Sequence, residues 1–255
     1  MSVDCTRDPP VATITISNPD RKNAVDSDSA EAMAAHINEL AHDDAIRCVV
    51  LTGEGDAFCS GLDLVGETGD MSPAEELEIG LNAIVRRLLR MDKPTVARVP
   101  GAAVGAGASL ATACDFVYAV EDAFFQWKFT DIGLAPDTGA TYVLPRLVGT
   151  RRALELLATA ESVPAPEAAE SGLINEAISP GDFDAVVEDR IDQLANRPTM
   201  ALGAAKRLVY RSHNRSLEET LKGEARAQET LIQSEDFEEG LSAFLEGREP
   251  EFKGR

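Results

Sequence analysis

The sequence contains few of the residues that usually build metal or redox sites. It has only three histidines, at positions 36, 42 and 213, which are too scattered for a His-based metal site or a catalytic triad. The four cysteines, Cys5, Cys48, Cys59 and Cys114, show neither metal-ligand spacing nor the density of a disulfide scaffold. We interpret them as reduced and buried, and we expect no metal site.

Long hydrophobic runs are also missing. The chain has no stretch of about 18 uncharged apolar residues, the length that crossing a membrane requires. Its first residues, MSVDCTRDPP, lack the basic-then-apolar pattern of a secretory signal. We therefore expect a cytoplasmic protein with no membrane partner.

Positive charge is scarce, and lysine contributes little of it. Asp and Glu number 44 against 24 Lys and Arg, which gives a net charge of −20, and only six of the cations are lysines. Repulsion from such a surface argues against nucleic acid as a partner. An acidic, lysine-poor surface suits a high-salt cytosol, so a halophilic source and an ordinary acidic protein both remain open.

What the chain does contain predicts an α/β fold. Apolar residues make up 44% of its 255 residues, enough for one large core. Strand-like and helix-like segments alternate up to about residue 195, and only charged, helix-like segments follow. We predict an α/β core over residues 1–195 and a C-terminal α-helical region over residues 196–255.

The individual elements follow from local pattern. Short β-branched or apolar runs predict strands at residues 11–17, 48–53, 95–99, 115–120 and 173–178. Helices are predicted from Asp26 or Ser27 to about His42, from an N-capping Ser72 to Arg90, and from Thr150 onward.

Two glycine-rich loops lie where a predicted strand leads into a helix. They are GEGDAFCSGLDL over residues 53–64 and GAAVGAGASL over residues 101–110. Such loops direct main-chain N–H groups into a cleft at a helix N-terminus, where negative charge is favoured. Either loop alone is more often only a turn.

Together, the two loops resemble the crotonase (enoyl-CoA hydratase/isomerase) superfamily, most closely its Asp-containing isomerases. The resemblance covers nearly the whole chain, including residues 18–24, 133–137, 147–153, 168–174 and 239–252. It implies a spiral of β-β-α turns and an acyl-CoA thioester as substrate. It also implies no permanently bound cofactor, with coenzyme A present only as part of the substrate. The expected assembly is a homotrimer or hexamer held by the C-terminal helices.

The resemblance further implies an oxyanion hole formed by the backbone N–H groups of Leu62 and Ala106. Removing a proton next to a thioester makes an enolate. Two preorganised donors stabilise that oxyanion more than they stabilise the neutral carbonyl.

A second set of residues is assigned to CoA by the family pattern. These residues are Ala57, Phe58, Ser60, Arg21, Lys22, Phe252 and Lys253. Ala57, Phe58 and Ser60 are expected along the CoA moiety, with Arg21 or Lys22 near its phosphates. Phe252 and Lys253 are expected to reach the nucleotide bound by a neighbouring subunit. Each basic residue alone is more often plain surface charge.

The sequence departs from the hydratases at the two glutamates that activate water. Those positions correspond here to Ser109 and Phe129, and neither can act as a carboxylate base. Asp137 stands where hydratases usually have glycine, in a segment similar to that of enoyl-CoA isomerases and of 4-chlorobenzoyl-CoA dehalogenase. Because Asp is also a good helix N-cap, catalysis and capping both remain open for Asp137.

We predict an enoyl-CoA isomerase with Asp137 as its base. One carboxylate is enough for a 1,3-proton shift, since no water has to be activated. The apolar neighbours Phe129, Ile132 and Leu134 would raise the pKa of Asp137 toward neutrality, as suits a general base. Ser109, Phe129 and Leu134 are expected to contact the substrate.

Four other functions remain open. Asp137 could attack the substrate, giving a dehalogenase or thioester hydrolase, and Phe125, Trp127 and Phe129 suit an aromatic acyl group. A hydratase could use Asp137 with Ser109. A serine hydrolase could be built on GASLA around Ser109, although that motif lacks the final glycine. The last alternative is a CoA-ester-binding protein without turnover.

The acyl group is not specified by the sequence. We expect the roof of its pocket from residues 65–70 and from the helix near Leu81 and Ile84. Because such loops vary, the length of the acyl group stays open.

Overall fold

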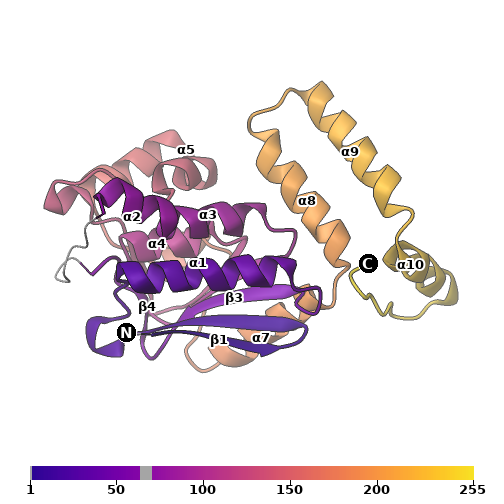
Figure 1. Ribbon diagram of the computed structural model, residues 1–255, viewed down its shortest axis with the longest axis horizontal. Coiled ribbons are helices and arrows are strands. Elements are labelled where there is room, and N and C mark those ends of the chain that lie inside the picture. The colour runs from indigo at the N-terminus through magenta and orange to yellow at the C-terminus, as the bar shows by residue number, and fades with distance from the viewer. Residues whose placement is uncertain (1, 64–70) are drawn as a thin grey trace.

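The computed structural model describes residues 2–63 and 71–255. In this part of the chain a mixed α/β core is followed by helices that extend away from it (Figure 1). The predicted fold class is therefore confirmed. No helix within these residues is both long and apolar enough to cross a membrane.

Two sheets organise the core. The strands of the larger sheet are β1 (Ser2–Asp8), β2 (Val11–Ser17), β3 (Cys48–Gly53), β5 (Thr95–Val99), β7 (Phe116–Val120) and β10 (Glu176–Ile178), in the order β1-β2-β3-β5-β7-β10. The strands of the smaller sheet are β4 (Ala57–Cys59), β6 (Ala102–Val104), β8 (Phe124–Gln126) and β9 (Val163–Pro164), in the order β4-β6-β8-β9. Only the pairs β1–β2 and β8–β9 are antiparallel among these strands.

From β3 to β8, successive strands alternate between the two sheets, and helical segments connect one pair to the next. The helical elements of the core are α1 (Ser27–His42), α2 (Pro73–Ile79), α3 (Leu81–Arg90), α4 (Ala106–Ala113), α5 (Ala140–Thr159), α6 (Ala165–Glu170), α7 (Phe183–Ala195), η1 (Pro19–Arg21) and η2 (Thr130–Ile132). The pairs β3/β4, β5/β6 and β7/β8 each place one strand in each sheet. This repetition is the predicted spiral of β-β-α turns.

Helix α1 forms as its sequence predicts. The Asp26 side chain accepts a hydrogen bond from the Ser29 N–H at 2.9 Å, so Asp26 is the N-cap. Met33, Ile37 and Leu40 lie on one face of the helix and are fully buried. Each such side chain contributes about 1.5–3 kcal/mol through burial.

Two helix predictions need correction. The predicted helix from Ser72 to Arg90 does start at a Ser72 cap, but Gly80 breaks it. A Cβ on Gly80 would lie 2.9 Å from the Cβ of Ala30, so close contact with α1 favours glycine there. A helix does run from Thr150 as predicted, but it is the second part of α5, which starts at Ala140 and is interrupted by the non-helical Gly149 (φ 76°).

Strands β1, β4, β6, β8 and β9 were not predicted; of these, β4, β6, β8 and β9 are each only two or three residues long. Strand β1 is largely exposed and carries charged side chains, so it lacks the apolar alternation that reveals a strand. Strand β6 lies inside the second glycine-rich loop and spans only Ala102–Val104.

The C-terminal helices are α8 (Thr199–Ser212), α9 (Leu217–Leu231) and α10 (Glu235–Glu246), and they confirm the predicted helical region. After α10 the chain is not helical. It folds back so that the buried Asp236 carboxylate accepts hydrogen bonds from the N–H groups of Lys253 (2.6 Å) and Gly254 (2.8 Å). The domain boundary at residues 195/196 stays a prediction.

A buried ion pair connects α8 to the core. The Lys206 Nζ lies 2.6 Å from Asp115 Oδ2 and also donates to the Leu88 carbonyl at 2.5 Å. Asp115 further accepts from the Thr95 N–H and hydroxyl and from the Tyr210 hydroxyl at 3.1 Å. Because these groups satisfy one another away from water, they fix the direction in which α8 leaves the core.

Candidate active site

The two glycine-rich loops are in direct backbone contact. A Cβ on Gly107 would lie 2.1 Å from the Cys59 carbonyl oxygen, so only glycine allows α4 to approach β4 this closely. Gly61 (φ +104°) and Gly105 (φ +56°) have positive φ values that favour glycine. A Cβ on Gly61 would lie 3.6 Å from the Ala106 backbone nitrogen.

This contact positions the N–H groups of Leu62 and Ala106. Leu62 forms a parallel bridge with Val25, in which the Val25 N–H donates to the Gly61 carbonyl at 2.8 Å and Val25 accepts from the Asp63 N–H at 2.8 Å. In that pattern the N–H of Leu62 points away from Val25. Ala106 is the first residue of α4, where helical N–H groups lack internal partners. Neither N–H donates to another residue in the described part of the chain.

Asp137 lies in the loop between η2 and α5 and is half-buried. Its Oδ1 accepts a hydrogen bond from the Thr138 hydroxyl at 2.7 Å. Gly139 is the N-cap of α5, and no side chain caps this helix, so the interpretation of Asp137 as an N-cap is wrong. Burial raises the pKa of Asp137 above its ordinary value, and the Thr138 hydrogen bond partly opposes that rise.

Thr138, which bonds the Asp137 carboxylate, was not singled out by the sequence. It is buried and has a φ of +51°, which is rare for a β-branched residue and costs on the order of 1–3 kcal/mol. The next residue, Gly139, also has positive φ, and a Cβ there would lie 3.0 Å from the Val85 side chain. The loop carrying Asp137 is therefore held tightly against α3.

The two positions assigned to hydratase glutamates hold no carboxylate. Ser109 is buried in α4, and its hydroxyl donates to the Gly105 carbonyl at 3.1 Å. Phe129 is buried at the start of η2. A serine hydrolase loses support, because the Ser109 hydroxyl bonds its own helix and the histidines lie on α1 and just after α8.

Several apolar side chains differ from expectation. Leu134 and Ile132 are 50% and 55% exposed in the single chain, so of the three predicted apolar neighbours of Asp137 only Phe129 is buried. Leu81 and Ile84 themselves are buried in the core, whereas their neighbours Asn82 and Val85 on the same helix line a cavity. Residues 65–70, the other part of the expected roof, lie outside the described residues.

The aromatic residues that suited an aromatic acyl group also need correction. Phe125 and Trp127 are fully buried in the hydrophobic core. Their rings pack against other core side chains, so they do not form the wall of an open pocket. The dehalogenase alternative therefore loses the sequence feature that favoured it.

Three of the residues assigned to CoA line one cavity. Lys22, Ala57 and Ser60 border a cavity of about 650 Å³ beside β6 and β8. The Lys22 Nζ lies 2.8 Å from an Asp56 carboxylate oxygen. The Ser60 hydroxyl donates a hydrogen bond to the backbone carbonyl of Arg21 at 2.9 Å. The Phe58 side chain is fully buried, so at this position only the backbone could lie along CoA, and the assignment of Phe58 stays a prediction.

The remaining residues assigned to CoA lie elsewhere. Arg21 is paired with Asp63 at 2.6 Å. The Phe252 carbonyl accepts a hydrogen bond from Arg47 at 2.7 Å, and Lys253 follows it in the folded-back tail. Figure 1 places this C-terminus beside α10, away from β4 and α4. The structure therefore does not bring Phe252 and Lys253 to the glycine-rich loops of the same chain.

Comparison with known proteins gives the family. The family model for enoyl-CoA hydratase/isomerase matches residues 6–255. The 1,2-epoxyphenylacetyl-CoA isomerase of Escherichia coli (strain K12) is 35% identical over 250 residues, which cover 96% of this chain and 95% of that protein. The 4-chlorobenzoyl coenzyme A dehalogenase-2 of Arthrobacter sp is 34% identical over 241 residues, with 92% and 87% covered.

Solved structures agree with these matches. An enoyl-CoA hydratase from Polaromonas sp. JS666 superposes with a TM-score of 0.90 at 31% identity, over 99% of this chain and 100% of that one. The spiral core, the paired glycine-rich loops and the full-length matches lead to one conclusion. This chain belongs to the enoyl-CoA hydratase/isomerase family.

Proposed function

We propose that this protein is an enoyl-CoA isomerase in which Asp137 moves the proton and the N–H groups of Leu62 and Ala106 hold the thioester oxygen. The observation that carries the proposal is the state of Asp137. Its carboxylate is half-buried, has a raised pKa and is not used to cap α5. A carboxylate in that state suits a general base near neutral pH.

The oxyanion hole is supported by the backbone contact between the two loops. Leu62 and Ala106 both have N–H groups without an acceptor among the described residues, and the Gly61 and Gly107 contacts fix them relative to each other. Loss of one donor in such a hole typically costs about 3–4 kcal/mol in the barrier. CoA is proposed to enter along the cavity bordered by Lys22 and Ser60.

The reaction needs only one carboxylate. Asp137 takes a proton from the α-carbon of a 3-enoyl-CoA, which gives a conjugated enolate held by the two N–H groups. The same carboxyl group returns the proton to the γ-carbon, which leaves the conjugated 2-enoyl-CoA. Ser109 and Phe129 offer no base to activate water, which favours isomerisation over hydration. The similarity to a 1,2-epoxyphenylacetyl-CoA isomerase of E. coli supports an isomerisation of an acyl-CoA.

The test follows the ultraviolet absorbance of the conjugated thioester. Absorbance should rise when the protein meets a 3-enoyl-CoA, and Asp137→Asn should abolish the rise. The matched control is Asp131→Asn, which removes an exposed carboxylate from the neighbouring η2 and should leave the rate unchanged. Falling absorbance with a 2-enoyl-CoA would show hydration instead. Full activity in Asp137→Asn would reject Asp137 as the base.

We also propose that residues 196–255 assemble the protein into a homotrimer or hexamer. Large apolar side chains on α9, on α10 and just after α9 are exposed in the single chain, including Phe244 at 80%, Leu245 at 75%, Leu217 at 71% and Ile232 at 58%. Exposed apolar surface on this scale marks an interaction site. Light scattering on the purified protein should give a multiple of three chains, and Phe244→Asp should lower that mass. A monomeric native protein would contradict the proposal.

A further inference from the structure

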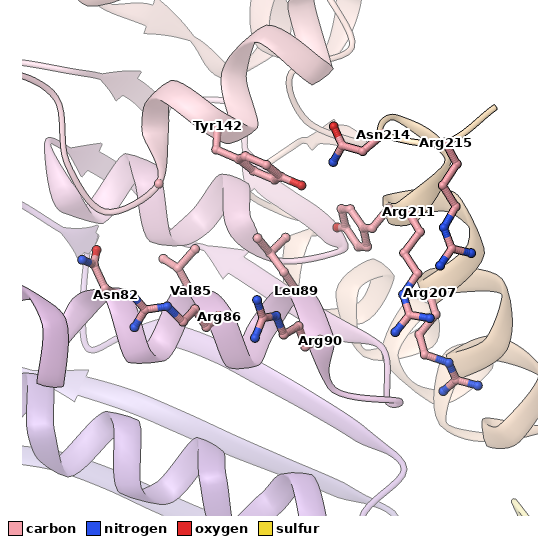
Figure 2. Close-up of a pocket in the computed structure, with 12 residues that line it drawn as sticks. Asn82, Val85, Arg86, Leu89, Arg90, Tyr142, Arg207, Arg211, Asn214 and Arg215 are labelled. Atoms are coloured by element: carbon pink, nitrogen blue, oxygen red, sulfur yellow. The ribbon is translucent and has the colours of Figure 1, made fainter. Parts of the chain in front are cut away.

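Arginines gather around a cavity that the proposed mechanism does not explain. This cavity, of about 800 Å³, lies between α3, the start of α5 and α8 (Figure 2). Its basic lining residues are Arg86 and Arg90 on α3, Arg207 and Arg211 on α8, and Arg215 just after α8. Figure 2 shows Arg90 and Arg211 on opposite sides of the gap.

Spacing along the helices explains how the arginines converge. Arg86 and Arg90 are four residues apart on α3, and Arg207 and Arg211 are four apart on α8, so each pair shares a helix face. The buried Lys206–Asp115 pair holds α8 against the core and brings the two faces together.

Carboxylates neutralise only part of this charge. Arg86 pairs with Glu78 at 2.6 Å, and Arg207 pairs with Asp92. Arg90, Arg211 and Arg215 form no ion pair with a carboxylate within the described ranges, in a chain that has 44 acidic residues. Like charges that face one cavity repel one another, so an anion that enters it is attracted by all of them.

The opposite end of the cavity is apolar and lies next to the catalytic loop. Val85 and Leu89 form an apolar row on α3, and the Tyr142 ring lies across from them (Figure 2). Gly139, which is two residues after Asp137, also lines the cavity. The walls therefore change from apolar near Asp137 to cationic at α8.

We infer that this cavity receives the distal part of the acyl group and that its arginines bind a carboxylate at the end of that group. The inference rests on the proposed function, which places the thioester beside Asp137, two residues from Gly139 in the cavity wall. The row of Val85 and Leu89 would contact methylene groups, and guanidinium groups bind carboxylates in a planar, two-hydrogen-bond geometry. The substrate class is an enoyl-CoA whose acyl chain ends in a carboxylate.

The test compares two 3-enoyl-CoA substrates of equal chain length, one with a terminal methyl and one with a terminal carboxylate. The native protein should prefer the carboxylate. Arg90→Gln and Arg211→Gln should each lower kcat/KM for it at least tenfold, mainly through KM, with little change for the methyl substrate. Arg87→Gln is the control, because Arg87 is an exposed arginine of α3 that does not line the cavity.

Binding of the two saturated acyl-CoA analogues, measured by calorimetry, separates this inference from the proposed isomerase activity. Tighter binding of the carboxylate analogue, lost in Arg90→Gln, supports the inference even if neither enoyl-CoA is isomerised. Equal binding of both analogues by the native protein overturns it, whatever the catalytic result. If Arg90→Gln and Arg211→Gln change only the oligomeric mass of the protein, the arginines contact another copy of the chain. That result also overturns the inference.

Discussion

The closest backbone contact in the proposed site gives a sharp test of the oxyanion hole. Gly107, in the first turn of α4, lies directly over Cys59 at the end of β4. In Gly107→Ala the new methyl carbon would lie 2.1 Å from the Cys59 carbonyl oxygen and 2.8 Å from the Cys59 Cβ. Because backbone atoms cannot rotate away, α4 itself must move.

The required movement sets the size of the effect. Real Cβ contacts are essentially never shorter than 3.0 Å, so α4 and β4 must separate by about 0.9 Å. That movement displaces the Ala106 N–H relative to the Leu62 N–H. A misplacement of about 1 Å can cost about a hundredfold in rate, which is close to the loss of one oxyanion donor. Overpacking should also lower stability by about 1–3 kcal/mol.

The assay measures kcat/KM for a 3-enoyl-CoA together with a thermal melt, so that loss of activity is compared only among folded proteins. Gly107→Ala should lose about a hundredfold in kcat/KM. Gly181→Ala is the matched control, because a Cβ there meets nothing within 4 Å and φ is not positive. A folded Gly107→Ala variant with native activity would refute the placement of the hole between these loops.

Three further predictions follow from buried ionisable groups. Because burial raises the pKa of Asp137, kcat/KM should fall as the pH drops through that raised pKa, and a flat acid limb in the pH profile would contradict this. The raised pKa also has a consequence for stability. The contribution of Asp137 to the free energy of unfolding is complete below its pKa in the unfolded chain and is lost as the pH rises through its pKa in the folded protein. Asp137→Asn should therefore raise the Tm more at neutral than at acidic pH. Lys206→Met removes a side chain that is 8% exposed and leaves the Asp115 carboxylate buried without its cation, which should cost about 3–5 kcal/mol in urea unfolding. The same change at the exposed Lys222 should cost less than about 0.5 kcal/mol, and equal costs at the two lysines would contradict the role of the pair.

Local interactions explain what could be predicted from the sequence. The α1 cap at Asp26 and the α2 cap at Ser72 depend on residues a few positions apart, and both predictions are confirmed. The strands at residues 11–17 and 48–53 follow from runs of β-branched and apolar side chains. The order and spacing of the two glycine-rich loops, together with matching segments along nearly the whole chain, indicated the family. Asp137 was identified as the candidate base from its own segment, residues 136–139, which resembles that of the isomerases.

Tertiary contacts decided what the sequence left open. Gly80 breaks a helix because α1 lies against it, and Phe58 faces the core although its neighbour Ser60 lines a cavity. Thr138 has a positive φ that its residue type disfavours, in a loop whose next residue, Gly139, lies against α3. The arginines of α3 and α8 are separated by more than a hundred residues, and only the packing of α8 brings them around one cavity. Sequence pattern reports each residue's local preference, whereas a pocket depends on distances between elements that are set when the whole core packs.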